Sequence, residues 1–373
     1  MTASGIECVA RKGSEYRGCG IPTLLQTGTI MTHPQGAHLV GSVNYDDAET
    51  TMRQAAGILG DRLKRIPDGE CGPRFHWIMF QPDVLGQAAG IERVGDERIP
   101  LRMLDARPLR VADGVDPASL VLPPLGYASA AQQSYAIFRR LRDEGTVPAG
   151  TRFQVSLPTP LAVVGAFFPA EQRAAIEPVY RAAMYRELDE ILASIPHEDL
   201  AIQWDNAVEF GMIEGVSAAP WWDGDVWEGL TVRSAEQADR VAADVEVGFH
   251  LCYGDVAEKH FVEPADAGNL VRFANMLTAA SSRRIDWIHL PVPIERDDDA
   301  YYAPLDGLEI GETELYLGLV HREDGAEGAQ RRIDVALRHA PVFGVATECG
   351  IGRAPEGTTE GILRTHAEVA AAW

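Results

Sequence analysis

The stretch VGFHLCYGD, residues 247–255, is a short apolar run that carries a histidine and a cysteine two positions apart. Its length and composition are typical of a strand. Side chains at positions i and i+2 of a strand point to the same face. We therefore expect His250 and Cys252 to project side by side. An imidazole and a thiol presented together are two groups that bind metal ions.

Seven further segments resemble this one, because each is short, mostly apolar and followed by a helical pattern or a long excursion. They span residues 38–43, 65–70, 152–160, 200–209, 286–293, 314–321 and 342–349. Eight strands that alternate with helices predict an α/β fold, a (β/α)8 TIM barrel. We assign residues 35–373 to one barrel domain and residues 1–34, which show little periodicity, to a loose N-terminal arm.

Two stretches, roughly residues 81–127 and 210–233, are longer than ordinary loops. Long insertions in this fold usually lie at the face formed by the carboxyl ends of the strands, where the active site is built. We expect both insertions at that C-terminal face.

The chain is acidic, with 33 Lys and Arg against 55 Asp and Glu and a formal charge of −22. This balance argues against nucleic acid and anionic membranes as partners. No run approaches the roughly 18 apolar residues of a membrane span, and no signal peptide pattern begins the chain. The five cysteines are too few and scattered for a disulfide framework. We expect a cytoplasmic protein whose thiols are free or bind metal.

Polar side chains occupy the carboxyl ends of the predicted strands. The residues that we single out there are Ser42, Glu70, Asp205, His250, Cys252, His289, His321, Glu348 and Cys349. Apolar strands that finish in such side chains build a polar pocket on a rigid rim.

Cys349 ends the last predicted strand, at the same height in a barrel as His250 and Cys252. Zinc takes thiolate and imidazole ligands in a tetrahedron, and three protein ligands leave the open position of a catalytic site. Two thiolates and an imidazole are too soft a set for magnesium or calcium. The sequence therefore predicts a Zn²⁺ site at these three residues.

These residues resemble the catalytic domain of cobalamin-independent methionine synthase, in whose family a His-x-Cys-Tyr strand and a late Asp-Cys-Gly segment hold zinc. The matching segments here are HLCY (250–253) and TECGIGR (347–353). Four further segments are similar to family motifs and occur in family order: LVGSV (39–43), DGE (68–70), IQWDNAVE (202–209) and GLVH (318–321). The superfamily also includes the epoxyalkane:coenzyme M transferases, which are single-domain zinc enzymes.

The resemblance implies a transferase that alkylates or methylates a thiol. Zinc binds the substrate thiol as a thiolate, which then attacks an electrophilic carbon. By position, Ser42, Glu70 and Asp205 would hold the amino acid part of the thiol substrate, and His321 would act as general acid or proton relay near the leaving group.

Three positions depart from the family pattern. The family's fourth zinc ligand is a Glu, which segment 286–293 lacks; His289 is the candidate substitute, or else it contacts the ligands or the substrate. Glu348 replaces the family's Asp beside the last cysteine and is expected in the pocket, near the metal and the substrate. Asn206 stands where the family has Glu, which puts methyl-folate in doubt as the donor.

An alternative activity on the same scaffold is a zinc-dependent hydrolase or lyase that uses metal-activated water. The partners that we expect are a small-molecule thiol and an alkyl donor. A homodimer is compatible with the fold, although no stretch of the chain specifies one.

Overall fold

Seven parallel strands form the central sheet of the computed structural model, which describes residues 33–254 and 259–373. In spatial order they are β1 (Arg65–Pro67), β6 (Arg152–Pro158), β7 (Leu200–Asn206), β8 (Glu246–Leu251), β9 (Trp287–Pro291), β10 (Glu314–Val320) and β11 (Gly344–Thr347). Every neighbouring pair is parallel. Each strand falls within or overlaps a segment predicted from the sequence, so seven of the eight predicted strands are confirmed.

The eighth predicted strand, residues 38–43, is present as isolated bridges rather than as a regular strand. Ala37 pairs with Leu63, just before β1, and also with Val345 in β11. Farther along, Ser42 pairs with Gly69 and Val43 with Ile351. This extended segment therefore binds to both edges of the sheet.

The sheet curls, as the buried cation Arg65 demonstrates. Arg65 begins β1, yet its guanidinium contacts Glu246, the first residue of β8, at 2.6 Å and Glu314, the first residue of β10, at 2.8 Å. In a flat sheet β1 and β10 would be separated by the width of four intervening strands, about 24 Å. The amino ends of the strands therefore meet around one side chain.

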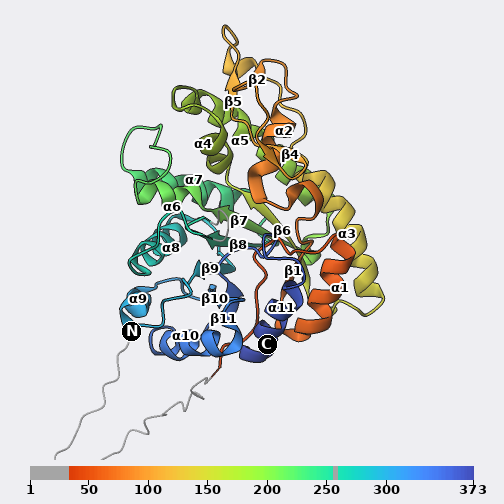
Figure 1. Cartoon of the computed structure of the whole chain (residues 1–373), viewed down its shortest axis with the longest axis vertical. Coiled ribbons are helices and arrows are strands. Elements are labelled where there is room, and N and C mark those ends of the chain that lie inside the picture. The colour runs from red at the N-terminus through yellow and green to blue at the C-terminus, as the bar shows by residue number, and fades with distance from the viewer. Residues whose placement is uncertain (1–32, 255–258) are drawn as a thin grey trace, which may run out of the picture. The chain divides into compact units, whose positions relative to one another are not determined.

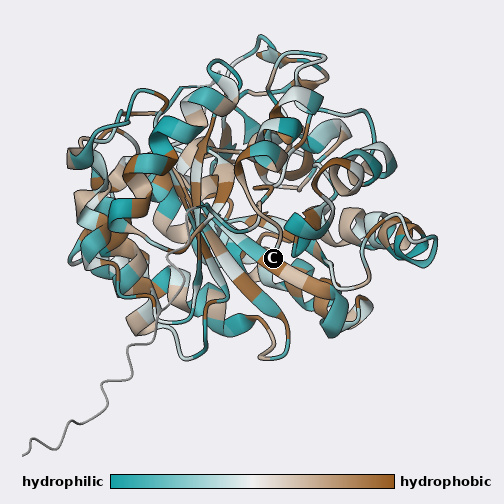
Figure 2. Cartoon of the chain, turned by 90° about the horizontal axis from the view of Figure 1, so that it is seen from below, coloured by the Kyte–Doolittle hydropathy of each residue, from teal (hydrophilic) through white to brown (hydrophobic). Residues whose placement is uncertain are grey.

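Helices follow the strands and lie around them (Figure 1). They are α1 (Ala48–Leu59), α3 (Tyr127–Asp143), α4 (Pro160–Phe167), α5 (Ala170–Ser194), α6 (Val208–Ile213), α7 (Val226–Arg240), α8 (Gly268–Ala280), α9 (Asp299–Tyr302), α10 (Gly325–His339) and α11 (Thr359–Val369). Asp47 caps α1 by accepting a hydrogen bond from the Thr50 amide at 2.8 Å. Helices cover the outside of the curled sheet, and its inner face closes on itself, so β7, β9 and β11 are buried along their whole length. Hydrophilic residues are concentrated on the outer helices (Figure 2).

The predicted insertion at 81–127 carries its own small elements. They are α2 (Gln81–Leu85) and two antiparallel pairs, β2 (Ile91–Arg93) with β5 (Leu109–Val111) and β3 (Pro100–Leu101) with β4 (Leu104–Asp105). Gln172 of α5 bonds to the Val111 backbone and so ties this insertion to the helix.

The prediction of a long loop over 210–233 is wrong at both ends. Residues 210–213 finish α6, and α7 begins at Val226, where Asp225 caps it by accepting from the Glu228 amide at 3.0 Å. Residues 1–32 of the predicted arm lie outside the described residues, which belong to one unit, Met31–Trp373. Within the described part of the chain, no helix has the length and apolar character needed to cross a membrane.

Candidate metal centre

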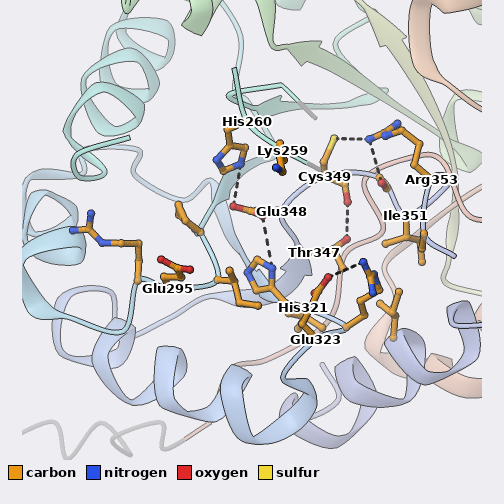
Figure 3. Close-up of a pocket in the computed structure, with 18 of the residues that line it drawn as sticks. Lys259, His260, Glu295, His321, Glu323, Thr347, Glu348, Cys349, Ile351 and Arg353 are labelled. Atoms are coloured by element: carbon orange, nitrogen blue, oxygen red, sulfur yellow. Dashed lines mark hydrogen bonds and ion pairs between the residues drawn. The ribbon is translucent and has the colours of Figure 1, made fainter. Parts of the chain in front are cut away.

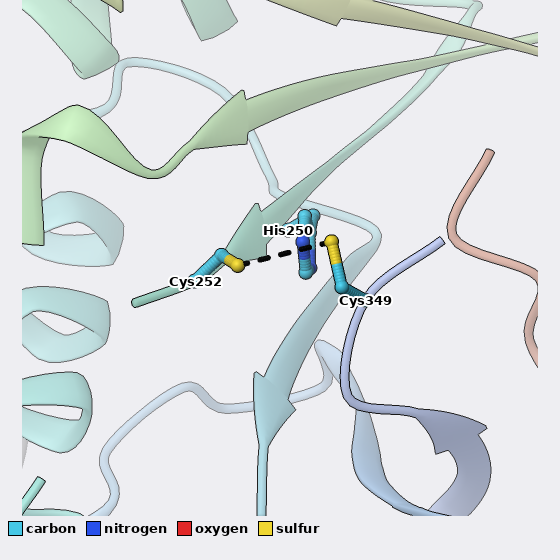
Figure 4. A group of neighbouring side chains, drawn as sticks. All are labelled: His250, Cys252 and Cys349. Carbon is cyan, nitrogen blue, oxygen red and sulfur yellow. Dashed lines mark hydrogen bonds between the residues drawn. The ribbon is translucent and has the colours of Figure 1, made fainter. Parts of the chain in front are cut away.

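Three predicted ligands meet at the carboxyl ends of the strands. His250 lies in β8, Cys252 follows β8, and Cys349 follows β11 (Figure 4). One ligand atom from each residue lies within 4.8 Å of the other two, and the two sulfur atoms are 3.9 Å apart. The curl of the sheet brings Cys349 across β9 and β10 to reach the other two. The donor set is the one that zinc prefers.

Both cysteine sulfurs receive hydrogen bonds that stabilise a thiolate. The Gly254 amide donates to Cys252 Sγ at 3.2 Å, and the Arg353 guanidinium donates to Cys349 Sγ at 3.5 Å. Amide and guanidinium donors favour the charged form of a thiol. Cys252 and Cys349 are therefore suited to bind a metal ion as thiolates.

The imidazole of His250 is oriented by a second histidine. His250 Nδ1 lies 2.7 Å from Nδ1 of His289, whose Nε2 lies 3.0 Å from the carbonyl oxygen of Thr347. His250 Nε2 is buried and has no hydrogen-bond partner among the described residues. Burial, together with the neighbouring His289, holds the pKa of His250 well below its ordinary value, so the ring is neutral and able to bind a metal.

The structure does not bring His289 into the group of three. Its two ring nitrogens face His250 and Thr347, and burial lowers its pKa to about 3. His289 thus lies behind His250, on the adjacent strand and at the paired register position.

A cavity of about 200 Å³ opens beside the three ligand residues. Ser42, Glu70 and Asp205 line it, together with His250, Cys252 and Cys349. The sequence therefore identified six residues that share one cavity. Apolar side chains also line the cavity, among them Ile78, Met79, Ala166, Val208 and Phe261.

Two carboxyl groups in this cavity resist ionisation. Burial raises the pKa of Glu70 to about 7. Burial and the nearby Glu70 raise the pKa of Asp205 well above its ordinary value, although Gln203 donates to Asp205 Oδ1 at 2.9 Å. A bound cation would relieve both effects, so the pair is suited to hold an ammonium group.

The loop after β1 holds Glu70 in an unusual backbone conformation. Its φ is 50°, in the left-handed region that non-glycine residues rarely adopt. Asp68 maintains this turn, because its Oδ1 accepts from the Glu70 amide at 2.9 Å and its Oδ2 binds Arg74 and Ser134. Such strain is often found where a side chain must point into a site.

Ser42 packs against the loop that carries Cys349. The Gly352 amide donates to Ser42 Oγ at 3.3 Å. A Cβ atom on Gly350 would lie 2.3 Å from Ser42 Oγ, which is too close for any side chain. Glycine at position 350 therefore allows this loop to approach Ser42.

His321 and Glu348 line a second, larger cavity of about 560 Å³ (Figure 3). Glu348 Oε2 lies 3.7 Å from His321 Nδ1, while His321 Nε2 donates to the Val292 carbonyl at 2.8 Å. Cys349, Gly350 and Arg353 line both cavities. His321 and Glu348 thus line a different cavity from Ser42, Glu70 and Asp205, and Cys349 lines both.

Sequence reasoning missed His260. Its side chain is only 6% exposed, and Nε2 lies 3.0 Å from Glu348 Oε1. Although burial opposes its charge, Glu348 raises the pKa of His260 to about 9. The only signal in the sequence was its position shortly after β8, which also fits an ordinary loop residue.

Together the fold and the site define an α/β protein with a TIM-barrel-like curled sheet and a candidate His/Cys/Cys metal centre at the strand ends. Solved structures with this fold include a B12-independent methionine synthase from Shewanella sp. W3-18-1 in complex with selenomethionine, at 15% identity and a TM-score of 0.54, covering 90% of this chain and 97% of that one. A putative vitamin-B12 independent methionine synthase from Listeria monocytogenes has 15% identity and a TM-score of 0.52, with the same coverage.

A methyltransferase from Methanosarcina mazei has 11% identity and a TM-score of 0.53, covering 90% of this chain and 93% of that one. No protein-family model and no curated protein sequence matches the chain. The resemblance inferred from the motifs is thus confirmed at the level of the fold.

Proposed function

We propose that this protein is a zinc-dependent transferase that moves an alkyl or methyl group to the sulfur of a small thiol. The single observation that carries the proposal is the convergence of His250, Cys252 and Cys349 within 4.8 Å beside a cavity with two carboxyl groups. Three protein ligands leave a fourth position for a substrate. Bound there, zinc would lower the pKa of a substrate thiol.

The cavity residues would bind and orient that thiol. Glu70 and Asp205 would pair with an ammonium group, which restores the charge that burial suppresses in both carboxyls. Ser42, which lines the same cavity, would add a hydrogen bond from its Oγ. The apolar side chains would cover the carbon chain of the thiol and exclude water.

The second cavity would hold the alkyl donor. Its residue Cys349 also lines the thiol cavity, so the two substrates would meet at the proposed metal. His321 Nε2 donates its proton to the Val292 carbonyl, so Nδ1, which faces Glu348, is the unprotonated nitrogen. Nδ1 would accept the proton that the substrate thiol releases and then pass it to the leaving group. Glu348 would orient this imidazole.

We further infer that the extended segment 35–43 serves as the eighth strand of the barrel. Its bridges to Leu63 and Val345 link the two edges of the sheet, and its Ser42 reaches the cavity. Residues 68–126, which follow the carboxyl end of β1, would then form the insertion over the active face.

Metal analysis with matched cysteine variants tests the site. The purified protein should bind about one zinc per chain, and Cys252→Ala and Cys349→Ala should each lose it. Cys71→Ala is the control, since Cys71 contacts Thr51 and the Tyr45 and Asp68 carbonyls instead and does not line the cavity. Retention of stoichiometric zinc by both ligand variants would overturn the proposal.

Cobalt substitution then distinguishes transfer from the hydrolase or lyase alternative. The two cysteine ligands already give sulfur-to-cobalt charge transfer, so a thiol that occupies the fourth position should add a further sulfur-to-cobalt charge-transfer band when it is added to the cobalt protein. A panel of thiols should include homocysteine and coenzyme M, each then paired with methyl-folate and with epoxides. Absence of the band with every thiol would favour metal-activated water and contradict the transferase.

A further inference from the structure

The hydrogen-bond chain behind the metal centre has only one possible polarity. A carbonyl oxygen only accepts, so the ring nitrogen of His289 that faces Thr347 must carry the proton. In the neutral ring the other nitrogen, Nδ1, is then an acceptor. Nδ1 of His250, 2.7 Å away, must therefore be the donor. The lone pair of His250 is left on Nε2.

That lone pair belongs to the buried nitrogen without a hydrogen-bond partner among the described residues. The direction of the hydrogen bonds from His250 through His289 to Thr347 thus leaves Nε2 of His250 able to bind a metal ion together with the two cysteine sulfurs. We infer that His289 is a positioning residue that sets the tautomer and ring angle of His250, and not a metal ligand. This inference rests on the metal site in the proposed function.

Gly318 leaves room for the hydrogen bond between His289 and Thr347. The bond from His289 in β9 to Thr347 at the end of β11 passes over β10 at Gly318. A Cβ atom on Gly318 would lie 2.8 Å from His289 Nε2 and 2.7 Å from the Thr347 oxygen. Gly318 therefore keeps open the gap that this hydrogen bond crosses. Substituting Gly318 offers a way to disturb His289 without changing any histidine or cysteine.

The first test reads the tautomer in the metal-free protein. Side-chain ¹⁵N NMR of His250, assigned with His250→Gln, should show a protonated Nδ1 and an unprotonated Nε2. In His289→Leu the preference for that tautomer should be lost. A protonated Nε2 in the unsubstituted metal-free protein would overturn the inference, whatever the enzyme's activity.

The second test measures zinc affinity by competition with a chelator. Loss of a partner that orients a metal-binding histidine typically weakens affinity about 10- to 100-fold. We expect this range for His289→Leu and Gly318→Val, with partial recovery in His289→Asn, which retains a hydrogen-bonding amide. His366→Leu is the control, since His366 is also a buried histidine but bonds to Ile362 in its own helix. Affinity in His289→Leu within twofold of the unsubstituted protein would contradict the inference.

X-ray absorption at the zinc edge separates a positioning role from ligation. The unsubstituted protein should show one imidazole and two sulfurs from the protein, and His289→Leu the same set. Two imidazoles, one of them lost in His289→Leu, would identify His289 as a ligand. That result would leave the proposed function standing, whereas zinc retained without either cysteine would refute the function itself.

Discussion

Glu70 illustrates how single residues of this site are held in unfavourable states. The side chain is a carboxylic acid with a pKa of about 7 on a backbone with φ of 50°. Both features cost stability in the free protein. In the proposed function, a bound ammonium group would stabilise the ionised carboxylate. Active sites commonly trade stability for function in this way.

Replacing Glu70 with Gln should stabilise the protein at high pH and weaken thiol binding. A carboxyl group whose pKa is higher in the folded than in the unfolded protein lowers the free energy of unfolding as pH rises past the unfolded-state pKa. This loss of stability reaches its full size once pH exceeds the folded-state pKa. The difference between 4.5 and about 7 corresponds to an upper limit of about 3 kcal/mol. Urea unfolding of both proteins should diverge between pH 4.5 and 7.

Binding of an ammonium-bearing thiol provides the second measurement on the same variant. In the unsubstituted protein affinity should rise as Glu70 ionises near pH 7, and in Glu70→Gln this rise should be absent. Equal pH profiles of the two proteins would mean that Glu70 does not bind the cation.

At the scale of residues, the sequence predicted the relative position of two side chains where the geometry of a single strand determines it. The i, i+2 spacing of His250 and Cys252 was enough to place them together. The relation of His250 to His289 depends on the register between β8 and β9, which no single strand encodes. The side to which His321 points depends on its bond to Val292, far away in the chain.

At the scale of elements, one buried ion pair holds the loop between β1 and α3. Asp68 and Arg74 are 92% and 81% buried by side chain, and Asp68 also binds Ser134 of α3 and the Glu70 amide. Burial alone would raise the pKa of Asp68, but Arg74 lowers it below its ordinary value. The pair therefore stabilises the fold above pH about 4, and this contribution is lost as pH falls through the lowered pKa.

Replacing Arg74 with Ala should destabilise the protein by about 3–5 kcal/mol, because Asp68 would remain buried without its partner. The affinity for the thiol should fall as well, since Asp68 maintains the turn at Glu70. Arg110→Ala is the matched control: its partner Glu92 is 2.7 Å away, but both are about half exposed, so about 0–1 kcal/mol is expected. Similar unfolding free energies for the two variants at pH 7 would disprove the role of the pair.

A strand or helix could be predicted where its own residues show the pattern of apolar side chains or caps that is typical of that element. Buried parallel strands appear as apolar runs, and seven such runs became strands. Segment 38–43 has the same composition, but its pairing with both sheet edges is irregular, which composition does not encode. The start of α7 was signalled by Asp225, a helix cap that was hidden within an acidic and aromatic stretch.

In the molecule as a whole, the buried Arg65 cluster and the candidate metal centre lie at opposite ends of the strands. Arg65, 2% exposed, stacks on Trp287 at 4.1 Å and binds Glu246 and Glu314 at the amino ends. His250 lies four residues beyond Glu246 in β8, or about 13 Å along a strand. In barrels of this kind the amino ends serve stability and the carboxyl ends catalysis.

Arg65→Met should therefore lower the unfolding free energy by about 3 kcal/mol or more, because two partly buried glutamates lose their shared cation. Zinc and thiol affinities of the folded variant should be unchanged. Arg152→Met, which removes a more exposed partner of Glu246 at 3.1 Å, should cost less. A variant Arg65→Met that is stable but fails to bind zinc would show that the two ends are coupled.

Cys349 belongs to the wall between the two cavities, and this position has a kinetic consequence. Under the proposed function, the nucleophile and the electrophile would enter from separate cavities, so neither would have to leave before the other binds. The reaction would then pass through a ternary complex, with no alkylated form of the protein between two half-reactions. Initial-rate lines for the two substrates would intersect rather than run parallel.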